Sequence, residues 1–282
     1  MNLAIVYEQQ GRFADSRTLQ QEVLAGFQKT LGPDHPDTLG AMINIASTYL
    51  AERRFAEGEA AFREFLEPAR RVLGPDHPDT LKGMVNLAQV EAALGKNREA
   101  ETLYGETLER RRRVLGPEAI PTLSVTNDLA RVLLELGDAP RAEALLDDAV
   151  KIERRVAPAG DPLLLSSLTN LAWARSARGH DADAATLVRE ALSGYERASP
   201  KDVEGTASAR LVLGRALTGL AQYSDAEPEL LGAEQALAAS DGPAHTQSTE
   251  ALAAMYRGWE RADPGKGHAA QADAWKTRAT AR

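Results

Sequence analysis

The chain has 282 residues, of which 43% are hydrophobic and 26% are charged, so it can bury a substantial core and does not have the composition of a disordered protein. Its 33 lysines and arginines against 41 aspartates and glutamates give a formal net charge of -8, which argues against DNA or RNA as a partner. Cysteine is absent, which excludes disulfides, thiolate zinc sites and cysteine nucleophiles. No signal pattern and no apolar run of membrane-spanning length is present, so we expect a cytoplasmic protein without a membrane partner.

The sequence repeats itself every 42 positions. The nonapeptide LGPDHPDTL occupies Leu31–Leu39 and again Leu73–Leu81. The same step aligns one column of large apolar residues and two columns of small residues along the chain. The small columns contain Ala4, Ala46, Ala88, Ala130, Ala172 and Gly214, and then Ser16, Gly58, Ala100, Ala142, Ala184 and Ala226. Columns that stay in phase without an inserted residue indicate an array of one supersecondary unit.

Each repeat is predicted to be a pair of helices, and no segment alternates with the period of a strand. The chain starts with MNLAIVY, which the register places in the middle of a helix, so we expect either a missing N-terminal portion or a short first helix. In the third repeat, apolar residues recur at helical spacing over 78–94 and again over 98–115. In chain order the predicted repeats are 1–35, 36–77, 78–119, 120–161, 162–203, 204–245 and 246–282.

The turn between the two helices of a pair is usually centred on a glycine. These glycines are Gly11, Gly95, Gly137 and Gly179. Arg53 and Ala221 occupy the same position in the second and sixth repeats. The nonapeptide lies between pairs, where Gly32 is expected to close the preceding helix and Pro36 to start the next one. The small columns are expected to let the two helices of a pair approach closely.

A metal site is the competing interpretation of the nonapeptide, because Asp34, His35 and Asp37 are residue types that bind metals. Two later copies keep the Gly-Pro pair and lose this cluster: LGPEAIPTL at Leu115–Leu123 and DGPAHTQST at Asp241–Thr249. Ligands confined to one exposed turn rarely form a closed coordination sphere. We therefore interpret the cluster as part of the helix linker and expect no metal and no other cofactor.

The wording "LGPDHPDTL…NLA…G…EAE" together with the period resembles the tetratricopeptide repeat, in the long 42-residue variant of kinesin light chains and many bacterial proteins. The resemblance covers essentially the whole chain and weakens after Ser199, where Val212 replaces the usual Asn. It implies an all-α, right-handed superhelix (solenoid) of about seven antiparallel helix pairs forming a single domain over 1–282. HEAT and armadillo arrays are the alternative, but they lack this Gly-Pro linker and the pair of small columns.

The resemblance also implies a peptide-binding groove lined by the first helix of each pair. In the family, an Asn column bonds the backbone of an extended peptide, and a neighbouring column contacts its side chains. The residues that match these positions are Asn44, Asn86, Gln89, Arg131, Asn170, Trp173, Arg215, Arg257 and Lys82. The three arginines would form a local positive wall, mainly from the fourth to the seventh repeat. Two alternatives stay open: the asparagines could bond within their own repeats, and Trp173 could be a packing residue.

Basic runs such as ERRRRVLG at 109–116 invite a nucleic-acid interpretation. They recur at the C-terminal end of second helices, where cations complement the helix dipole, and no aromatic residues interleave for base stacking. We therefore expect solvated helix ends rather than a nucleic-acid site. The sequence contains no P-loop, no G-x-S-x-G and no H-E-x-x-H, so we do not expect an enzyme.

The expected function is a protein-interaction scaffold that binds an extended, acidic peptide segment in the groove. The alternative is an assembly or regulatory module of a larger signalling protein, of the kinase or nucleotide-switch type, that acts through the array ends or the convex surface. A weaker third option is a ligand-sensing array that feeds a catalytic domain elsewhere. The sequence leaves the oligomeric state and the identity of the partner open.

Overall fold

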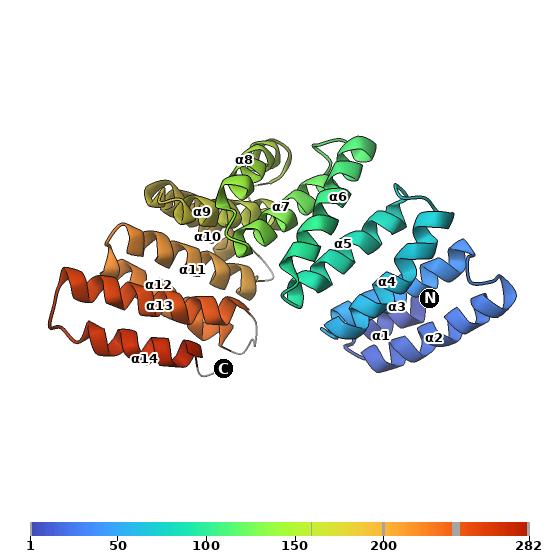
Figure 1. Ribbon diagram of the computed structural model, residues 1–282, viewed down its shortest axis with the longest axis horizontal. Coiled ribbons are helices and arrows are strands. Elements are labelled where there is room, and N and C mark those ends of the chain that lie inside the picture. The colour runs from blue at the N-terminus through green and yellow to red at the C-terminus, as the bar shows by residue number, and fades with distance from the viewer. Residues whose placement is uncertain (1, 159, 199–200, 239–242, 281–282) are drawn as a thin grey trace. The chain divides into compact units, whose positions relative to one another are not determined.

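A computed structural model describes residues 2–158, 160–198, 201–238 and 243–280 (Figure 1). All the regular structure in this part of the chain is helical, with fourteen helices and no strand. The chain divides into two compact units, Met1–Leu136 and Gly137–Arg282, which we describe separately. Asp241 and Gly242, the start of the last copy of the linker, lie outside the described residues.

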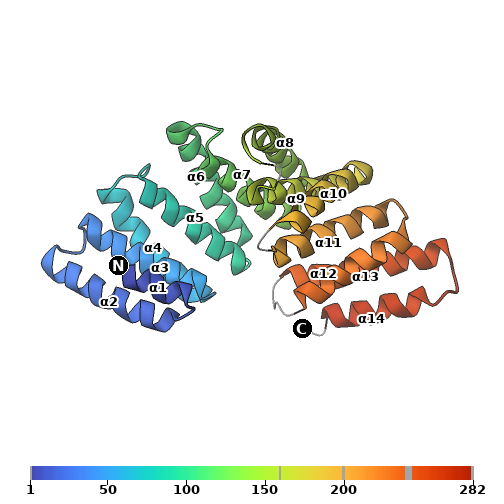
Figure 2. The same cartoon turned by 180° about the vertical axis from the view of Figure 1, so that it is seen from behind.

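Unit 1 consists of seven helices. They are α1 (Asn2–Gln9), α2 (Phe13–Thr30), α3 (Pro36–Ala51), α4 (Phe55–Val72), α5 (Pro78–Ala93), α6 (Asn97–Leu115) and α7 (Ile120–Glu135). Unit 2 also consists of seven. They are α8 (Ala139–Val156), α9 (Pro162–Ala177), α10 (Asp181–Arg197), α11 (Val203–Gly219), α12 (Tyr223–Leu237), α13 (Pro243–Ala262) and α14 (His268–Thr280). Both views show helices that are consecutive within a unit lying side by side (Figures 1 and 2).

Within each unit the helices pack in sequence order. Every helix contacts the next one along the chain. In addition, α3 contacts α5, α5 contacts α7, α9 contacts α11 and α11 contacts α13. Turns of three residues join α3 to α4, α5 to α6 and α9 to α10, which makes the partners antiparallel. The predicted all-α fold of successive antiparallel helix pairs is confirmed.

The two small columns lie in the core, as predicted. Ala88 and Ala100, the two members from the third repeat, are fully buried, and so are Ala172 and Ala184 two repeats later. The residues around them are large, and Phe62 and Met84 are also fully buried. Small residues therefore stand where the helices of a pair cross, and large ones fill the space beside the crossing.

The Gly-Pro linker ends one helix and starts the next. Gly32 has a φ of 94°, in the left-handed region, and its N–H donates to the Phe27 carbonyl at 3.2 Å. Pro36 is the first residue of α3, and the His35 ring caps that helix by accepting from the Asp37 N–H at 3.2 Å. Inside the corner, the buried Thr38 hydroxyl donates to the Gly32 carbonyl at 2.7 Å. The linker interpretation is confirmed, and the cap and the threonine bond are features that the sequence analysis did not foresee.

The two positions that lack the turn glycine keep the glycine conformation. Arg53 has a φ of 58° and Ala221 a φ of 57°, beside values of 76° for Gly95 and 81° for Gly137. A left-handed residue costs about 1–2 kcal/mol when it carries a Cβ. The hairpin geometry therefore imposes this conformation even where the local residue disfavours it.

The last pair departs from the small-residue pattern, because Tyr256 and His268 stand at its two small positions. The two side chains stack on each other with ring centroids 6.1 Å apart. Trp259 stacks on His268 at 4.2 Å, and the Tyr256 hydroxyl hydrogen-bonds the Glu227 carboxylate of α12. Stacked rings thus replace the alanine contact at this crossing.

Candidate functional site

In unit 1, the predicted groove residues of α5 differ in exposure. Lys82 and Gln89 are exposed, so both are available to a partner. Asn86 is half-buried, and its amide nitrogen donates to the Ser47 hydroxyl of α3 at 3.4 Å. This long bond links the first helices of two successive pairs, an arrangement that differs from the intra-repeat bond left open above.

Asn44 of α3 faces the preceding pair. It is half-buried and lines a small cavity with Gln20 and Val23 of α2 and Ala4 of α1. The cavity holds about 20 Å³ of free space, roughly enough for one water. Asn44 and Asn86 therefore both lie toward neighbouring helices, and the exposed predicted residues of α5 are Lys82 and Gln89.

Arg131 of α7 belongs to a partly buried group of polar side chains. Burial raises the pKa of the neighbouring Asp128 carboxyl, and the charges of Arg131 and Arg111 oppose that rise. Burial also raises the pKa of Tyr104 on α6, to which the Asp128 charge adds. Part of the Arg131 charge thus acts on Asp128, which stands about one helical turn before it on α7.

Unit 2 brings Trp173 and Arg215 together. They occupy the same register position on α9 and α11, and the guanidinium carbon of Arg215 lies 5.9 Å from the Trp173 ring centroid, within cation–π range. The guanidinium also approaches the Gln247 carbonyl at 3.4 Å. Arg257, the next member of the column on α13, is exposed. Asn170, by contrast, is buried, with 7% of its surface exposed.

The nine predicted residues fall in both units. Asn44, Lys82, Asn86, Gln89 and Arg131 belong to unit 1, and Asn170, Trp173, Arg215 and Arg257 belong to unit 2. Within unit 2, Trp173, Arg215 and Arg257 form one column, which we call the Trp-Arg column. It combines an aromatic ring with two cations on three successive first helices, a set of groups suited to carboxylates and to apolar side chains beside them.

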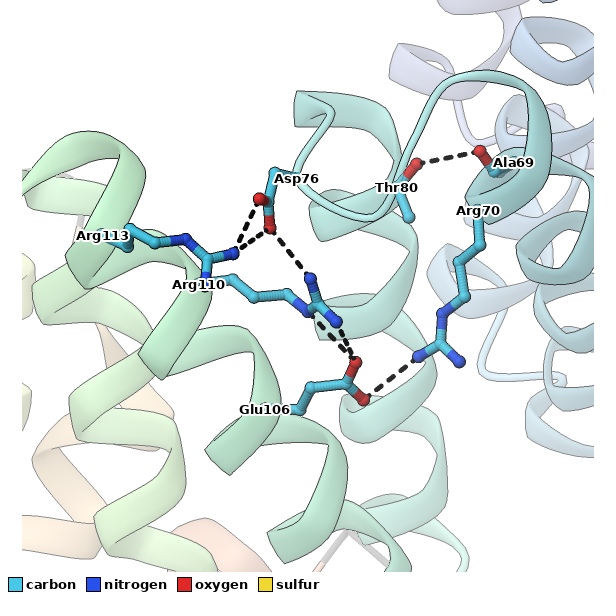
Figure 3. A network of polar contacts seen from close by, with 7 residues as sticks. All are labelled: Ala69, Arg70, Asp76, Thr80, Glu106, Arg110 and Arg113. Atoms are coloured by element: carbon cyan, nitrogen blue, oxygen red, sulfur yellow. Dashed lines mark hydrogen bonds and ion pairs between the residues drawn. The ribbon is translucent and has the colours of Figure 1, made fainter.

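The basic runs are engaged in ion pairs inside the molecule. The carboxylate of the linker residue Asp76 forms ion pairs with Arg110 at 2.9 Å and with Arg113 at 2.7 Å (Figure 3). The Glu106 carboxylate accepts hydrogen bonds from Arg110 and from Arg70 of α4, and so bridges these two arginines. These arginines hold the linker against the next second helix, which goes beyond the solvated helix ends we expected. The sequence signal was available, since Asp34 pairs with Arg71 at the same 37-residue separation as Asp76 with Arg113.

The nonapeptide cluster is engaged in the same way. Asp34 accepts from Arg71 at 2.6 Å, and the His35 ring nitrogen caps α3. In the second copy, His77 caps α5 through the Asp79 N–H at 3.2 Å. Each of these side chains has a structural task at the helix junction. No group of three or more histidine and carboxylate side chains in the described residues has the arrangement of a metal site.

None of the described helices is both long enough and apolar enough to pass through a lipid bilayer.

Comparison with solved structures supports the helix-pair architecture. A putative kinesin light chain from Podosopora anserina with nearly identical TPR-like repeats aligns with a TM-score of 0.61 and 26% identity, over 71% of this chain and 95% of that one. BtubC (BKLC) from P. vanneervenii aligns with a TM-score of 0.63 and 18% identity, over 82% and 92%. A signal transduction ATPase from Pyrococcus horikoshii with a tetratricopeptide repeat sensor aligns with a TM-score of 0.62 and 16% identity, over 99% of this chain and 40% of that one.

No curated protein sequence matches the chain. The family pattern described as tetratricopeptide repeat matches four overlapping segments, residues 1–67, 39–113, 83–155 and 121–197. Together these segments span more than half of the chain, and they coincide with the 42-residue columns and the helix pairs. The chain belongs to the tetratricopeptide repeat family, and its repeats are similar to those of kinesin light chains.

Proposed function

We propose that this chain is a protein-interaction module whose unit 2 holds an extended, acidic segment of a partner protein against the Trp-Arg column. Tetratricopeptide repeat proteins are generally interaction scaffolds, and the observation that carries the finer proposal is the pairing of Trp173 with Arg215 beside the exposed Arg257. The ring offers a flat apolar surface, and the two guanidinium groups offer donors that bind carboxylates in a bidentate fork.

The spacing of the column supports an extended ligand. Its members stand on α9, α11 and α13, and each of these first helices contacts the next. Packed helices are roughly 8–10 Å apart, so the column spans about 20 Å. An extended chain advances by about 3.3–3.6 Å per residue, so about six residues would cross all three helices. One carboxylate per helix would then require acidic residues about three positions apart.

The charge distribution favours an acidic ligand at this column in particular. Arg175, also on α9, is neutralised by Asp147 at 2.9 Å and by Glu143 at 3.4 Å. Arg257 is exposed and makes no ion pair with a carboxylate within the described residues, so its positive charge is available to a ligand. Since the chain carries a net charge of -8, the attraction is local and should weaken at high salt.

A matched pair of fluorescent peptides tests the proposal by anisotropy. The two octapeptides would be identical apart from glutamates in one and glutamines in the other. We expect the glutamate peptide to bind, and Arg257→Glu to weaken it by about tenfold, which corresponds to about 1.4 kcal/mol. Arg215→Glu should do the same, whereas Arg189→Glu, an equal charge change at an exposed position of the second helix α10, should leave binding unchanged.

Equal binding of the two peptides, or equal effects of Arg257→Glu and Arg189→Glu, would contradict the proposal. No peptide binding together with concentration-dependent self-association in light scattering would favour the alternative, an assembly or regulatory module. The proposed role requires binding without catalysis, and the cytoplasmic location stays a prediction.

A further inference from the structure

A hollow surface lies on the second-helix side of unit 1, whereas the Trp-Arg column belongs to unit 2. It is a cleft of about 760 Å³ between α4 and α6, with α5 as its floor. Three leucines provide the apolar part of its lining, and three arginines and three glutamates provide the charged part. The leucines are Leu66, Leu87 and Leu103. A volume in the range of about 300–1,000 Å³ is typical of ligand-binding clefts. We call this surface the α4–α6 cleft.

The arginines of the α4–α6 cleft are already neutralised by the protein. Arg63 contacts Glu91 at 2.7 Å and Glu59 at 3.0 Å. Arg70 contacts Glu106 at 3.2 Å, as Figure 3 shows, and Arg71 contacts the linker residue Asp34 at 2.6 Å. An anionic ligand would have to compete with each of these carboxylates for the same guanidinium groups.

The carboxylates of the cleft, in contrast, are incompletely paired. Glu67 on α4 and Glu99 on α6 make no ion pair and no hydrogen bond through their side chains within the described residues. Glu91 on α5 is 2% exposed, and although its Oε1 contacts Arg63, its Oε2 is buried with no hydrogen-bond partner. A buried acceptor without a donor destabilises the folded protein, so a donor supplied by a ligand would be favourable there.

Burial raises the pKa of the Glu91 carboxyl, with the Arg63 charge opposing the rise and the Glu59 and Glu99 charges adding to it. The carboxylates of Glu59 and Glu99 therefore repel that of Glu91 on the floor of the cleft. A cation brought into the cleft would relieve this repulsion, and an anion would increase it.

We propose that the α4–α6 cleft binds a partner polypeptide that inserts one lysine or arginine side chain flanked by aliphatic residues. The aliphatic stem and its neighbours would pack on the three leucines, and the cationic head would lie between Glu67 and Glu99 and donate toward Glu91. Long basic side chains bury their stems on apolar surface in this way while the charge stays near polar groups. The charge of this ligand is opposite to that of the acidic segment proposed for the Trp-Arg column of unit 2.

Methyl-labelled protein and three short peptides test this by NMR. The peptides have the sequence glycine, leucine, X, leucine, glycine with blocked ends, where X is arginine, glutamine or glutamate. We expect the arginine peptide to shift the methyl signals of Leu66, Leu87 and Leu103 saturably below about 5 mM, where a dissociation constant of about 1 mM is easily measured. The glutamine peptide should bind at least about fivefold more weakly, and the glutamate peptide should not bind.

Two variants separate the cleft from general surface charge. Glu67→Gln combined with Glu99→Gln should reduce the affinity for the arginine peptide to that of the glutamine peptide. Glu64→Gln removes a charge from an exposed residue of α4 that does not line the cleft, and should leave the affinity unchanged. Because all three residues are on the surface, helicity and the melting temperature should stay close to those of the wild type.

Several results would overturn the proposal. They are equal shifts with all three peptides, no saturable shift with any of them, and an unchanged affinity in the Glu67→Gln, Glu99→Gln double variant. Methyl shifts that depend on protein concentration without peptide would assign the cleft to a second copy of this chain instead. None of these results bears on the Trp-Arg column, so the two proposals can fail separately.

Discussion

The two small columns contain two glycines, Gly58 in unit 1 and Gly214 in unit 2, and replacing each with alanine should have opposite effects. A Cβ added at Gly58 would lie 3.6 Å from Val90 Cγ2 and 3.7 Å from Tyr49 Cβ, which are ordinary van der Waals contacts. A Cβ added at Gly214 would lie 2.4 Å from Leu230 Cγ, far inside the 3.5–4.0 Å or so at which carbon atoms pack.

The magnitudes follow from these contacts. In a helix interior, alanine is favoured over glycine by about 1 kcal/mol, and burying the methyl group adds about 0.8 kcal/mol, so Gly58→Ala should raise the free energy of unfolding by about 1–2 kcal/mol. At Gly214 the same propensity gain is opposed by overpacking of about 1–3 kcal/mol, because Leu230 is fully buried and has no room to move. Gly214→Ala should therefore lower the free energy of unfolding by about 1 kcal/mol.

Urea unfolding followed by circular dichroism measures the difference. With a slope of about 1–3 kcal/mol per molar urea, the two midpoints should move in opposite directions, by roughly half a molar each. Repeat arrays need not unfold in one step, so hydrogen exchange in α4 and α11 should be followed as well. Gly105→Ala is the control, because a Cβ there meets no atom within 4 Å and only propensity contributes. Stabilisation by Gly214→Ala equal to that of Gly105→Ala would refute the argument.

Three further predictions concern turns, caps and pH. Ala221→Gly should stabilise unit 2 by about 1 kcal/mol, because it removes an alanine from the left-handed region. Ala254→Gly, at an exposed helical position of α13, should destabilise unit 2 by about as much. The midpoints of urea unfolding measure both effects. Ala119→Asp should stabilise α7 by about 1 kcal/mol in thermal melts, because Ala119 has extended N-cap geometry and caps nothing. Glu153 is 1% exposed, and burial raises the pKa of its carboxyl to about 7. The free energy of unfolding should therefore fall by up to about 3 kcal/mol as pH rises from about 4.5 to 7. In urea titrations at several pH values, Glu153→Gln should flatten this pH dependence.

The sign for Glu153 follows from proton binding. The folded state holds this proton more tightly than the unfolded chain, so the stabilisation is complete below the unfolded pKa and is lost as pH rises through the folded value. The Ser167 hydroxyl bond to the carboxylate opposes the shift and is too weak to cancel it. A slope that stays the same in Glu153→Gln would show that another group is responsible.

Helix pairs, turns and linkers were predictable from the sequence because each depends on a residue type repeated in phase. Small residues at the repeat positions of Ala88 and Ala100 identify a helix crossing in each repeat. A glycine and a proline spaced as Gly32 and Pro36 identify a junction between two helices. Such features are local, so one column of the repeat is enough to reveal them. Arg53 shows the limit of this logic, since its left-handed conformation is dictated by the hairpin and contradicts its own preference.

The candidate site was less predictable, because exposure depends on neighbours that a single column does not contain. Asn86 was selected for its register, yet its amide lies against Ser47 of the preceding first helix. Trp173 and Arg215 were selected one at a time, and only the structure places the cation over the ring. The α4–α6 cleft was missed altogether, since Glu91 stands in a column whose other members are mostly large and apolar or cationic, and a lone glutamate there gives no signal of burial.

Ion pairs between successive repeats explain why the charge columns look irregular. Arg63 of α4 pairs with Glu91 of α5, and 84 residues later, at the same register, Asp147 of α8 pairs with Arg175 of α9, so the positions agree and the signs are reversed. The pair of Arg17 with Glu52 is reversed in the same way by that of Glu143 with Arg178.

Each of these columns taken alone contains both an acid and a base, which resembles a solvated surface. The cited pairs, in contrast, join opposite charges both in unit 1 and in unit 2. Such reversal has a consequence for assembly of the array. A second helix that carries Arg63, packed by mistake against the first helix that carries Arg175, would bring two guanidinium groups to the position of an ion pair. Like charges placed there disfavour that mispairing, so the same contacts that stabilise the correct neighbours also select them.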